Sequence, residues 1–278
     1  MEGHGSHWEC IYENLDTFAS ERLGELIQTT PVWRSVKLET PTLFEGVPMD
    51  QLYAFAENEG DVRFMGLVFH SSATGQNLFA SAYPFAAGGI VHSVTIDEIE
   101  PWEFGIEATI HGSTRFDADI SFFDPLYFLN KDQYRLGEEH NISFAAFAYT
   151  ASKPVHEQIE ITEGGLYEVA LQDGNVKEGE ALMIDCSKMA AMFPRDDVGG
   201  SVYEFQGEVL EHHHTSVDNR LLNVLKATVM RDTEQDDTPF NVPVYAAPHV
   251  LDEGFIPSHC TSMSGFFWLQ GFLIDKAA

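Results

Sequence analysis

Positive charge is scarce in this sequence. Its 278 residues include 15 Lys and Arg against 44 Asp and Glu, which gives a formal net charge of −29 at pH 7. Phosphate backbones are bound by cationic side chains that displace counterions, so a chain with this balance repels nucleic acids at long range. The acidic residues are scattered and form no tail or block, which is typical of a solubilising surface. We therefore do not expect a nucleic-acid partner.

Cysteine and long apolar runs are also scarce. The three cysteines, Cys10, Cys186 and Cys260, lie far apart in the chain. An odd and dispersed set argues against a disulfide framework. No apolar run reaches the roughly 18 residues that a membrane span requires, and the first residues show no basic stretch followed by an apolar core. These absences predict a cytoplasmic protein without membrane attachment.

Several common catalytic and nucleotide-binding motifs are missing. The sequence contains no G-x-G-x-x-G, no G-x-x-x-x-G-K-[ST], no G-x-S-x-G and no C-x-x-C, which argues against the nucleotide, hydrolase and redox sites that those motifs build. We assign no cofactor and no catalytic residue on this basis. The balance favours a protein that is not an enzyme.

Aromatic residues, in contrast, are abundant and indicate β structure. They make up 12% of the chain, with 21 Phe, in short runs bounded by Gly, Pro and Asp. The most apolar run, residues 265–273, predicts the closing strand of a core. One helix is predicted over residues 16–28, capped by Asp16 or Thr17, because apolar positions recur there at helical spacing. Residues 31–50 predict an extended arm along a sheet edge.

Two stretches of the chain repeat one order of strand-like segments. Ala108-Thr109 in the first corresponds to Ala227-Thr228 in the second, and Phe144 follows Pro125 by the nineteen positions that separate Phe267 from Pro248. Three antiparallel strands, a short helical crossover and a further strand form the order of an OB-type barrel. The segments span residues 90–96, 104–110, 116–123 and 140–149, then 203–210, 221–230, 240–245 and 263–273.

We therefore predict a mainly β protein with two OB-like antiparallel barrels, an N-terminal helix and few other short helices. The expected division comprises a helix and extended arm, a first barrel, a connector with a hairpin and a short helix, and a second barrel. These units span residues 1–50, 51–153, 154–202 and 203–278, and the short helix of the connector is predicted over residues 187–193, capped by Ser187. Because nearly every residue of the closing strands is apolar, we expect the barrels to pack on each other through them.

The tail Trp268-Leu269-Gln270-Gly271 resembles the last strand of uncharacterised bacterial proteins that end in the same four residues. The resemblance covers mainly the last third of the chain. It implies a bacterial protein of unknown function and no activity that can be carried over.

Three groups of side chains have ligand types that metals use. His212 and His214 share one side of a predicted strand, and imidazoles bind zinc or nickel; His249 and His259 are candidates to join them. Asp117 and Asp119 also share a strand face, which suits Mg²⁺, although a solvated strand face has the same pattern. The remaining group is His4, His7 and Cys10, in a Gly-rich terminus where chains usually fray.

Three function classes fit these observations. The first is a non-enzymatic binding or scaffolding module that recognises a protein, a peptide or a small ligand, with a protein partner or a second copy of the chain. The second is a metal-dependent hydrolase that uses His212/His214 or Asp117/Asp119. The third is an acidic nucleic-acid mimic or single-strand binder. The residues that line the largest cleft discriminate among them, since converging His and carboxylates favour the hydrolase.

Overall fold

The computed structural model describes residues 4–57, 59–154, 158–186, 189–195, 197–232 and 238–274. The protein is mainly β, with 54% strand and 14% helix, in several antiparallel sheets. The mainly β prediction is therefore confirmed. Within the described residues, none of the helices is both long and apolar enough to traverse a lipid bilayer.

The first part of the chain is helical, and its later helical segments follow one another without a break. Three consecutive segments cover Leu15 to Thr29, which confirms the helix predicted over residues 16–28. Its cap is Asn14, whose side-chain oxygen accepts a hydrogen bond from the Thr17 amide at 2.9 Å, so the expected cap at Asp16 or Thr17 was wrong. The helices are η1 His4–Cys10, α1 Leu15–Thr17, η2 Phe18–Arg22, α2 Leu23–Thr29, α3 Tyr127–Asn130, α4 Gly165–Gln172 and η3 Pro248–Val250.

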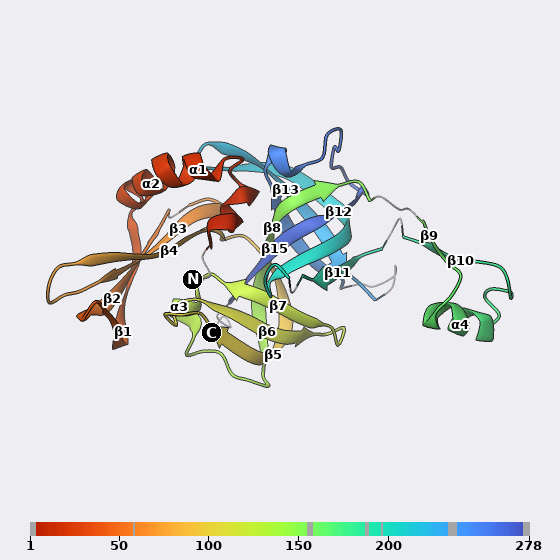
Figure 1. Ribbon diagram of the computed structural model, residues 1–278, viewed down its shortest axis with the longest axis horizontal. Helices are drawn as coiled ribbons and strands as arrows, with labels where there is room; N and C mark the ends of the chain where they lie inside the picture. Colours follow the sequence, from red (N-terminus) through yellow and green to blue (C-terminus); the bar gives the residue numbers. More distant parts are fainter. Residues whose placement is uncertain are drawn as a thin grey trace.

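A separate four-stranded antiparallel sheet follows the N-terminal helices (Figure 1). Its order is β1-β2-β3-β4, so the extended segment expected along a sheet edge is the edge strand β1. None of the four strands pairs with the larger sheet, which contains the remaining strands of the expected first barrel. The strands are β1 Val32–Phe44, β2 Val47–Ala56, β3 Val62–His70 and β4 Asn77–Ala86.

The larger sheet contains nine strands drawn from both repeats. Its order is β11-β12-β13-β14-β8-β15-β7-β6-β5, so β8 and β15 lie side by side at its centre. The strands are β5 Ile90–Pro101, β6 Ala108–Thr114, β7 Asp119–Asp124, β8 Glu139–Ser152, β11 Ala191–Pro194, β12 Val202–Val217, β13 Arg220–Met230, β14 Phe240–Ala246 and β15 Ser262–Leu273.

Two further pairings make this strand order cyclic. β5 pairs with β8 as well as with β6, and β12 pairs with β15 as well as with β13. The strands β5, β6, β7, β15 and β8 therefore form one cycle, the first strand cycle, and β12, β13, β14, β8 and β15 form the second strand cycle. In each cycle one pairing is parallel, β7 with β15 and β14 with β8. The two cycles share β8 and β15, so the pairing crosses the boundary between the expected units.

The register between β8 and β15 is symmetric about the pair Ala146↔Leu269. Phe144 pairs with Gly271, and Ala148 pairs with Phe267 at the mirrored place. Both first strands also carry an irregularity at matching places, between Ile96 and Glu98 in β5 and between Val209 and Glu211 in β12.

The second strands of the cycles match in a different register from the one expected. Ile96 pairs with Gly112, and Val209 pairs with Ala227. Ala227 therefore takes the place of Gly112 and not the expected place of Ala108. Short runs of small and β-branched residues fit several registers equally well, because a slip by an even number of residues keeps the same side chains inward.

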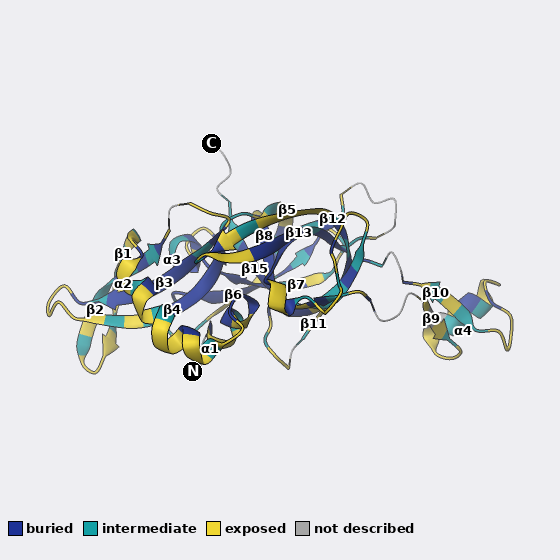
Figure 2. Cartoon of the chain, turned by 90° about the horizontal axis from the view of Figure 1, so that it is seen from above, coloured by how far each residue is buried: buried dark blue, intermediate teal, exposed yellow. Residues whose placement is uncertain are grey.

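Two buried clusters pack on opposite faces of the shared pair. One lies inside both strand cycles and includes Phe144, Ala146, Phe267 and Leu269. The other includes Phe147 and Trp268 and continues into η1 and the four-stranded sheet. The fully apolar closing strands are thus covered on both faces, as expected. The second cover is the N-terminal part of the chain and not a second barrel, and Figure 2 shows the buried positions gathered there.

The connector differs from its prediction. The segment 158–185 is a two-stranded sheet of β9 Gln158–Ile161 and β10 Leu182–Asp185, with helix α4 between the strands. It projects from the body (Figures 1 and 2). The helix expected over residues 187–193 is in part strand β11, which pairs with β12, and its predicted cap Ser187 lies outside the described residues. Pairing with an available edge overrides the weak helix preference of so short a segment.

Candidate functional site

The N-terminal segment η1 is buried and not frayed. His4, Trp8 and Cys10 are all buried, and His4 is 4% exposed. The Cys10 thiol lies 3.8 Å from the Phe147 carbonyl oxygen on β8. The Gly and Ser residues suggested a loose end, but Trp8, Ile11 and Tyr12 provide apolar surface that anchors the segment. Burial of these side chains offsets the conformational entropy of the small residues between them.

His7 packs flat against the shared pair. Its ring lies on Trp268 with a centroid distance of 3.9 Å and an interplanar angle of 4°, and its Nδ1 contacts the Tyr149 hydroxyl. Burial, and next the nearby His4, hold the pKa of His7 well below the ordinary 6.5. His7 is therefore a neutral packing residue at neutral pH, because a charged imidazole would lose its hydration there.

The tail motif Trp268-Leu269-Gln270-Gly271 connects the two sheets. The Trp268 indole N–H donates to the Ser201 hydroxyl at 3.1 Å. The Gln270 amide donates to the Pro84 carbonyl at 2.7 Å and accepts from the Ala86 amide at 3.0 Å. A Cβ on Gly271 would lie 2.7 Å from Phe122 and 2.9 Å from Phe144. Leu269 fills the inner core. Trp268 and Gln270 thus form hydrogen bonds to neighbouring segments, and Gly271 leaves room for neighbouring aromatic side chains.

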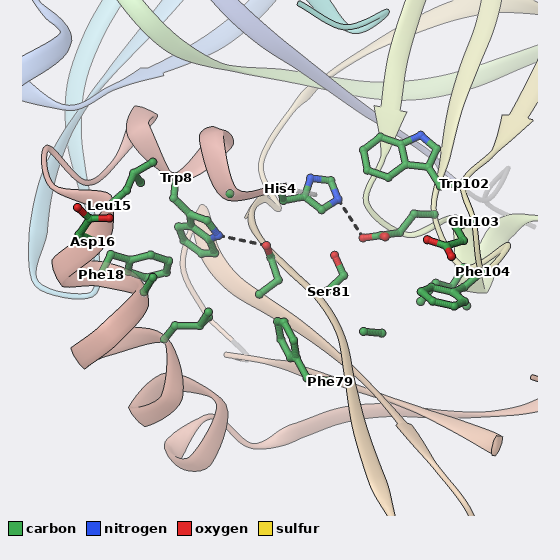
Figure 3. Close-up of a pocket in the computed structure, with 17 residues that line it drawn as sticks. His4, Trp8, Leu15, Asp16, Phe18, Phe79, Ser81, Trp102, Glu103 and Phe104 are labelled. Atoms are coloured by element: carbon green, nitrogen blue, oxygen red, sulfur yellow. Dashed lines mark hydrogen bonds and ion pairs between the residues drawn. The ribbon is translucent and has the colours of Figure 1, made fainter. Parts of the chain in front are cut away.

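A cavity of about 450 Å³ opens where η1, η2, β4 and the loop before β6 meet. Its wall is mainly apolar and includes several aromatic side chains (Figure 3), and its volume lies within the range that small-molecule sites use. The lining comprises His4, Gly5, Trp8, Leu15, Asp16, Phe18, Ala19, Leu23, Phe79, Ala80, Ser81, Ala82, Trp102, Glu103, Phe104, Ile106 and Glu107.

A buried acid–base pair lies in the cavity wall. His4 Nε2 is 3.0 Å from Glu107 Oε1, and the two side chains are 2% and 9% exposed. The His4 ring stacks on Trp102 at 4.8 Å with an angle of 17°, which fixes its plane. Figure 3 shows His4 near Trp102, with a dashed line that marks the contact of its ring with the carboxylate.

The predicted His212/His214 pair is exposed on β12. The two rings do share one side of the strand, with centroids 4.9 Å apart. His212 Nε2 lies 3.0 Å from the Asn223 side-chain oxygen. The expected helpers lie elsewhere, since His249 contacts the Glu9 carbonyl and His259 the Leu210 carbonyl, both at 2.8 Å.

The Asp117/Asp119 pair does not share a strand face. Asp117 lies in the turn between β6 and β7 with a φ of 52°, and only Asp119 is in the strand. The predicted strand began too early, because a turn residue with positive φ favours Asp over most residues. Over the described ranges, no group of three or more His, Cys, Asp and Glu side chains is placed to hold a metal ion.

Asp124 at the end of β7 is a buried carboxyl. It is fully buried, it lies 2.7 Å from the Tyr134 hydroxyl and it accepts from the Leu126 amide at 2.7 Å. Burial raises its pKa to about 7, and the hydrogen bonds oppose this shift. The sequence signal for this buried carboxyl was an acidic residue directly after Phe122 and Phe123 in a strand.

The cavity itself was not predicted from the sequence. Its lining comes from three segments that lie up to 103 positions apart, as His4 and Glu107 do, and no local pattern joins them. The excess of aromatic residues was the available signal. A comparison of the chain with protein-family models, with curated protein sequences and with solved structures finds no match.

Proposed function

We propose that this protein is a non-enzymatic binding module whose cavity between η1, β4 and the 102–107 loop holds a small, largely apolar ligand. The single observation that carries the proposal is the cavity of about 450 Å³ walled by five aromatic side chains. The aromatic residues are Trp8, Phe18, Phe79, Trp102 and Phe104. Sites of this size and character, with few polar groups that set orientation, are typical of small-molecule binding.

The chemistry in the wall favours binding over catalysis. The His4–Glu107 pair resembles the base and orienting acid of a hydrolytic site, but a nucleophile must lie within hydrogen-bond reach of the base. His4 Nε2 is directed at Glu107, and Nδ1 is buried with no hydrogen-bond partner among the described residues. The pair therefore supports a role in holding the wall and in orienting a ligand.

We further propose that each strand cycle is an OB-like barrel and that the two arose by internal duplication, with the closing strands exchanged. The cyclic order of five strands, the single parallel pairing in each cycle and the helical turn after the third strand support this. In this arrangement the barrels are scaffold, and the N-terminal part supplies the site.

The test of ligand binding uses the uncharged fluorescent probe N-phenyl-1-naphthylamine, whose emission rises in apolar surroundings. We expect saturable binding with a Kd in the micromolar range. Ala19→Trp places an indole in the cavity from the exposed side of η2 and is expected to weaken binding about tenfold or more, since each tenfold is about 1.4 kcal/mol.

The matched control is Ser20→Trp, which adds the same side chain one position along, on an exposed residue outside the cavity lining. It should leave the Kd unchanged. Equal probe binding by both variants would show that the probe occupies another surface and would overturn the proposed site.

A further inference from the structure

The charged side chains in the cavity lining are all acidic apart from His4. Glu107 is buried in the wall, whereas Asp16 and Glu103 are exposed. No Lys or Arg lines the cavity. The net charge of −29 adds a negative field around the whole molecule. An anionic ligand would therefore meet repulsion without a counter-charge, whereas a cation would be attracted.

The side-chain N–H donors of the lining are already engaged. The Trp8 indole donates to the Ala82 carbonyl at 3.1 Å, and the Trp102 indole donates to the Thr109 hydroxyl at 3.1 Å. His4 Nε2 lies 3.0 Å from Glu107 Oε1, so this ring nitrogen is engaged as well. Among the lining side chains, only the Ser81 hydroxyl remains as a donor. The cavity thus offers acceptors, and a ligand that fits it must bring the donors.

Glu107 has no Lys or Arg partner within the described wall. Its Oε1 lies 3.0 Å from His4 Nε2, and no hydrogen bond to its Oε2 is found among the described residues. His4 Nδ1 is buried without a hydrogen-bond partner in the described part of the chain. Glu107 Oε2 is therefore an acceptor that stays open to a ligand, next to aromatic faces.

We propose that the ligand of this cavity is a cationic amphiphile: an amine or ammonium group on an apolar body of aromatic size. The ammonium would bind at Glu107 Oε2 among the faces of Trp102 and Phe104, where cation–π attraction adds to the ion pair. The apolar body would lie against Trp8, Phe18 and Phe79. This inference rests on the proposed binding function and adds the charge of the ligand to it.

The experiment compares three ligands of one shape by displacement of N-phenyl-1-naphthylamine at pH 7. They are 2-(1-naphthyl)ethylamine, which is cationic, 2-(1-naphthyl)ethanol, which is neutral, and 1-naphthaleneacetate, which is anionic. We expect the amine to bind about tenfold or more tightly than the alcohol, and the acetate to bind most weakly, with a gap that narrows at 0.5 M NaCl as charges are screened.

Two variants locate the preference. Glu107→Gln keeps an acceptor for His4 and removes the charge, so the amine should lose at least about two thirds of its advantage over the alcohol. Glu39→Gln, at an exposed site on β1 outside the cavity, changes the net charge equally and should leave the advantage intact. If Glu107→Gln does not fold, Glu103→Gln at the exposed rim replaces it, with a smaller expected loss.

The outcomes separate the two proposals. If the probe binds and Ala19→Trp blocks it, but the alcohol or the acetate binds as tightly as the amine, the cation preference is overturned and the binding function stands. If neither the probe nor any of the three ligands binds at the Ala19-sensitive site, the proposed function fails, and the inference fails with it. An amine preference that Glu39→Gln reduces as much as Glu107→Gln would place the effect in the overall field and overturn the assigned contact.

Discussion

The two strand cycles have one order and one shared pair of strands, yet they differ in what is attached to them. Counted from the central pair Ala146↔Leu269, β8 places Ala145, Phe147 and Ala148 where β15 places Trp268, Gln270 and Gly271. The residue before the proline that follows the third strand is Asp124 in the first cycle and Ala247 in the second. The two cycles thus carry residues of different size or polarity at these equivalent positions.

The difference shows which positions carry attachment and which carry the cycle itself. Phe144 and Phe267 point into the cycles and are alike and buried on both strands. Two of the residues that differ, Trp268 and Gln270, face outward and contact the N-terminal part, at His7 and at β4. The third, Gly271, faces the inner core. The site therefore depends on substitutions on one face of β15 and not on the shared strand order.

The largest effect is expected at Trp268, the residue that most distinguishes β15 from β8. Trp268→Ala should lower the free energy of unfolding by about 3–5 kcal/mol, because it removes a fully buried indole and leaves a cavity. Urea unfolding monitored by circular dichroism measures the change. As control, Trp33→Ala removes a partly exposed indole from β1 and should cost about 1 kcal/mol. Equal costs would mean that β15 anchors nothing that β1 does not.

The next effect concerns Asp124 against Ala247. The folded-state pKa of about 7 lies above the ordinary 3.8, so the folded protein holds a proton that the unfolded chain releases. Stability from this group is complete below about pH 4 and is lost as pH rises to about 7, on the order of 4 kcal/mol.

Asp124→Asn mimics the protonated acid and should remove that slope. Unfolding midpoints measured from pH 4 to pH 8 provide the test, with the difference between wild type and variant as the quantity of interest. The difference cancels the common repulsion among the other acids. Parallel pH profiles for the two proteins would show that Asp124 is ionised in the fold.

A smaller effect is expected at Gly271, whose equivalent position in β8 is Ala148. Gly271→Ala introduces a Cβ at 2.7–2.9 Å from Phe122, Ile142 and Phe144 and should destabilise the fold by about 1–3 kcal/mol through overpacking. Gly24→Ala is the control, since nothing lies within 4 Å of a Cβ there. In helix α2 it should raise stability by about 0.5–1 kcal/mol. A neutral Gly271→Ala would show that the inner core yields at this point.

The smallest effect is expected at Gln270, whose equivalent position in β8 is Phe147. Gln270→Leu leaves the Ala86 amide and the Pro84 carbonyl without their bonds and should cost about 1–2 kcal/mol. The loss should be local, with faster hydrogen exchange at the Ala86 amide while the amides of β13 keep their protection. Uniformly faster exchange would mean that the two sheets do not open separately.

Sequence patterns predicted the elements better than their partners. The helix over residues 16–28 and the closing strands over residues 140–149 and 263–273 were predicted, because burial of one face is a local property of the sequence. Which strand lies beside β8 is not local, and no residue of β8 specifies β15. His212 and His214 were correctly placed on one side of a strand, since the two-residue period alone decides it.

The misses have particular causes. The burial of His4 depends on Trp102 and Glu107, about one hundred positions away, and only the apolar Trp8 beside it gave a signal. Asp117 was assigned to a strand because the alternation continued into a turn whose positive φ the pattern does not report. The cavity depends on both kinds of distant contact, so its lining was beyond reach of sequence patterns.

The presence of β8 and β15 in both strand cycles has a consequence for biosynthesis. The first cycle needs β15, whose residues are translated about 120 positions after those of β8. While the ribosome synthesises the intervening residues, β7 and β8 expose unpaired backbone groups and apolar faces, because their partner β15 does not yet exist. Such late long-range pairing makes for slow maturation, and it predicts that a nascent chain halted before residue 262 would engage chaperones instead of reaching a native half.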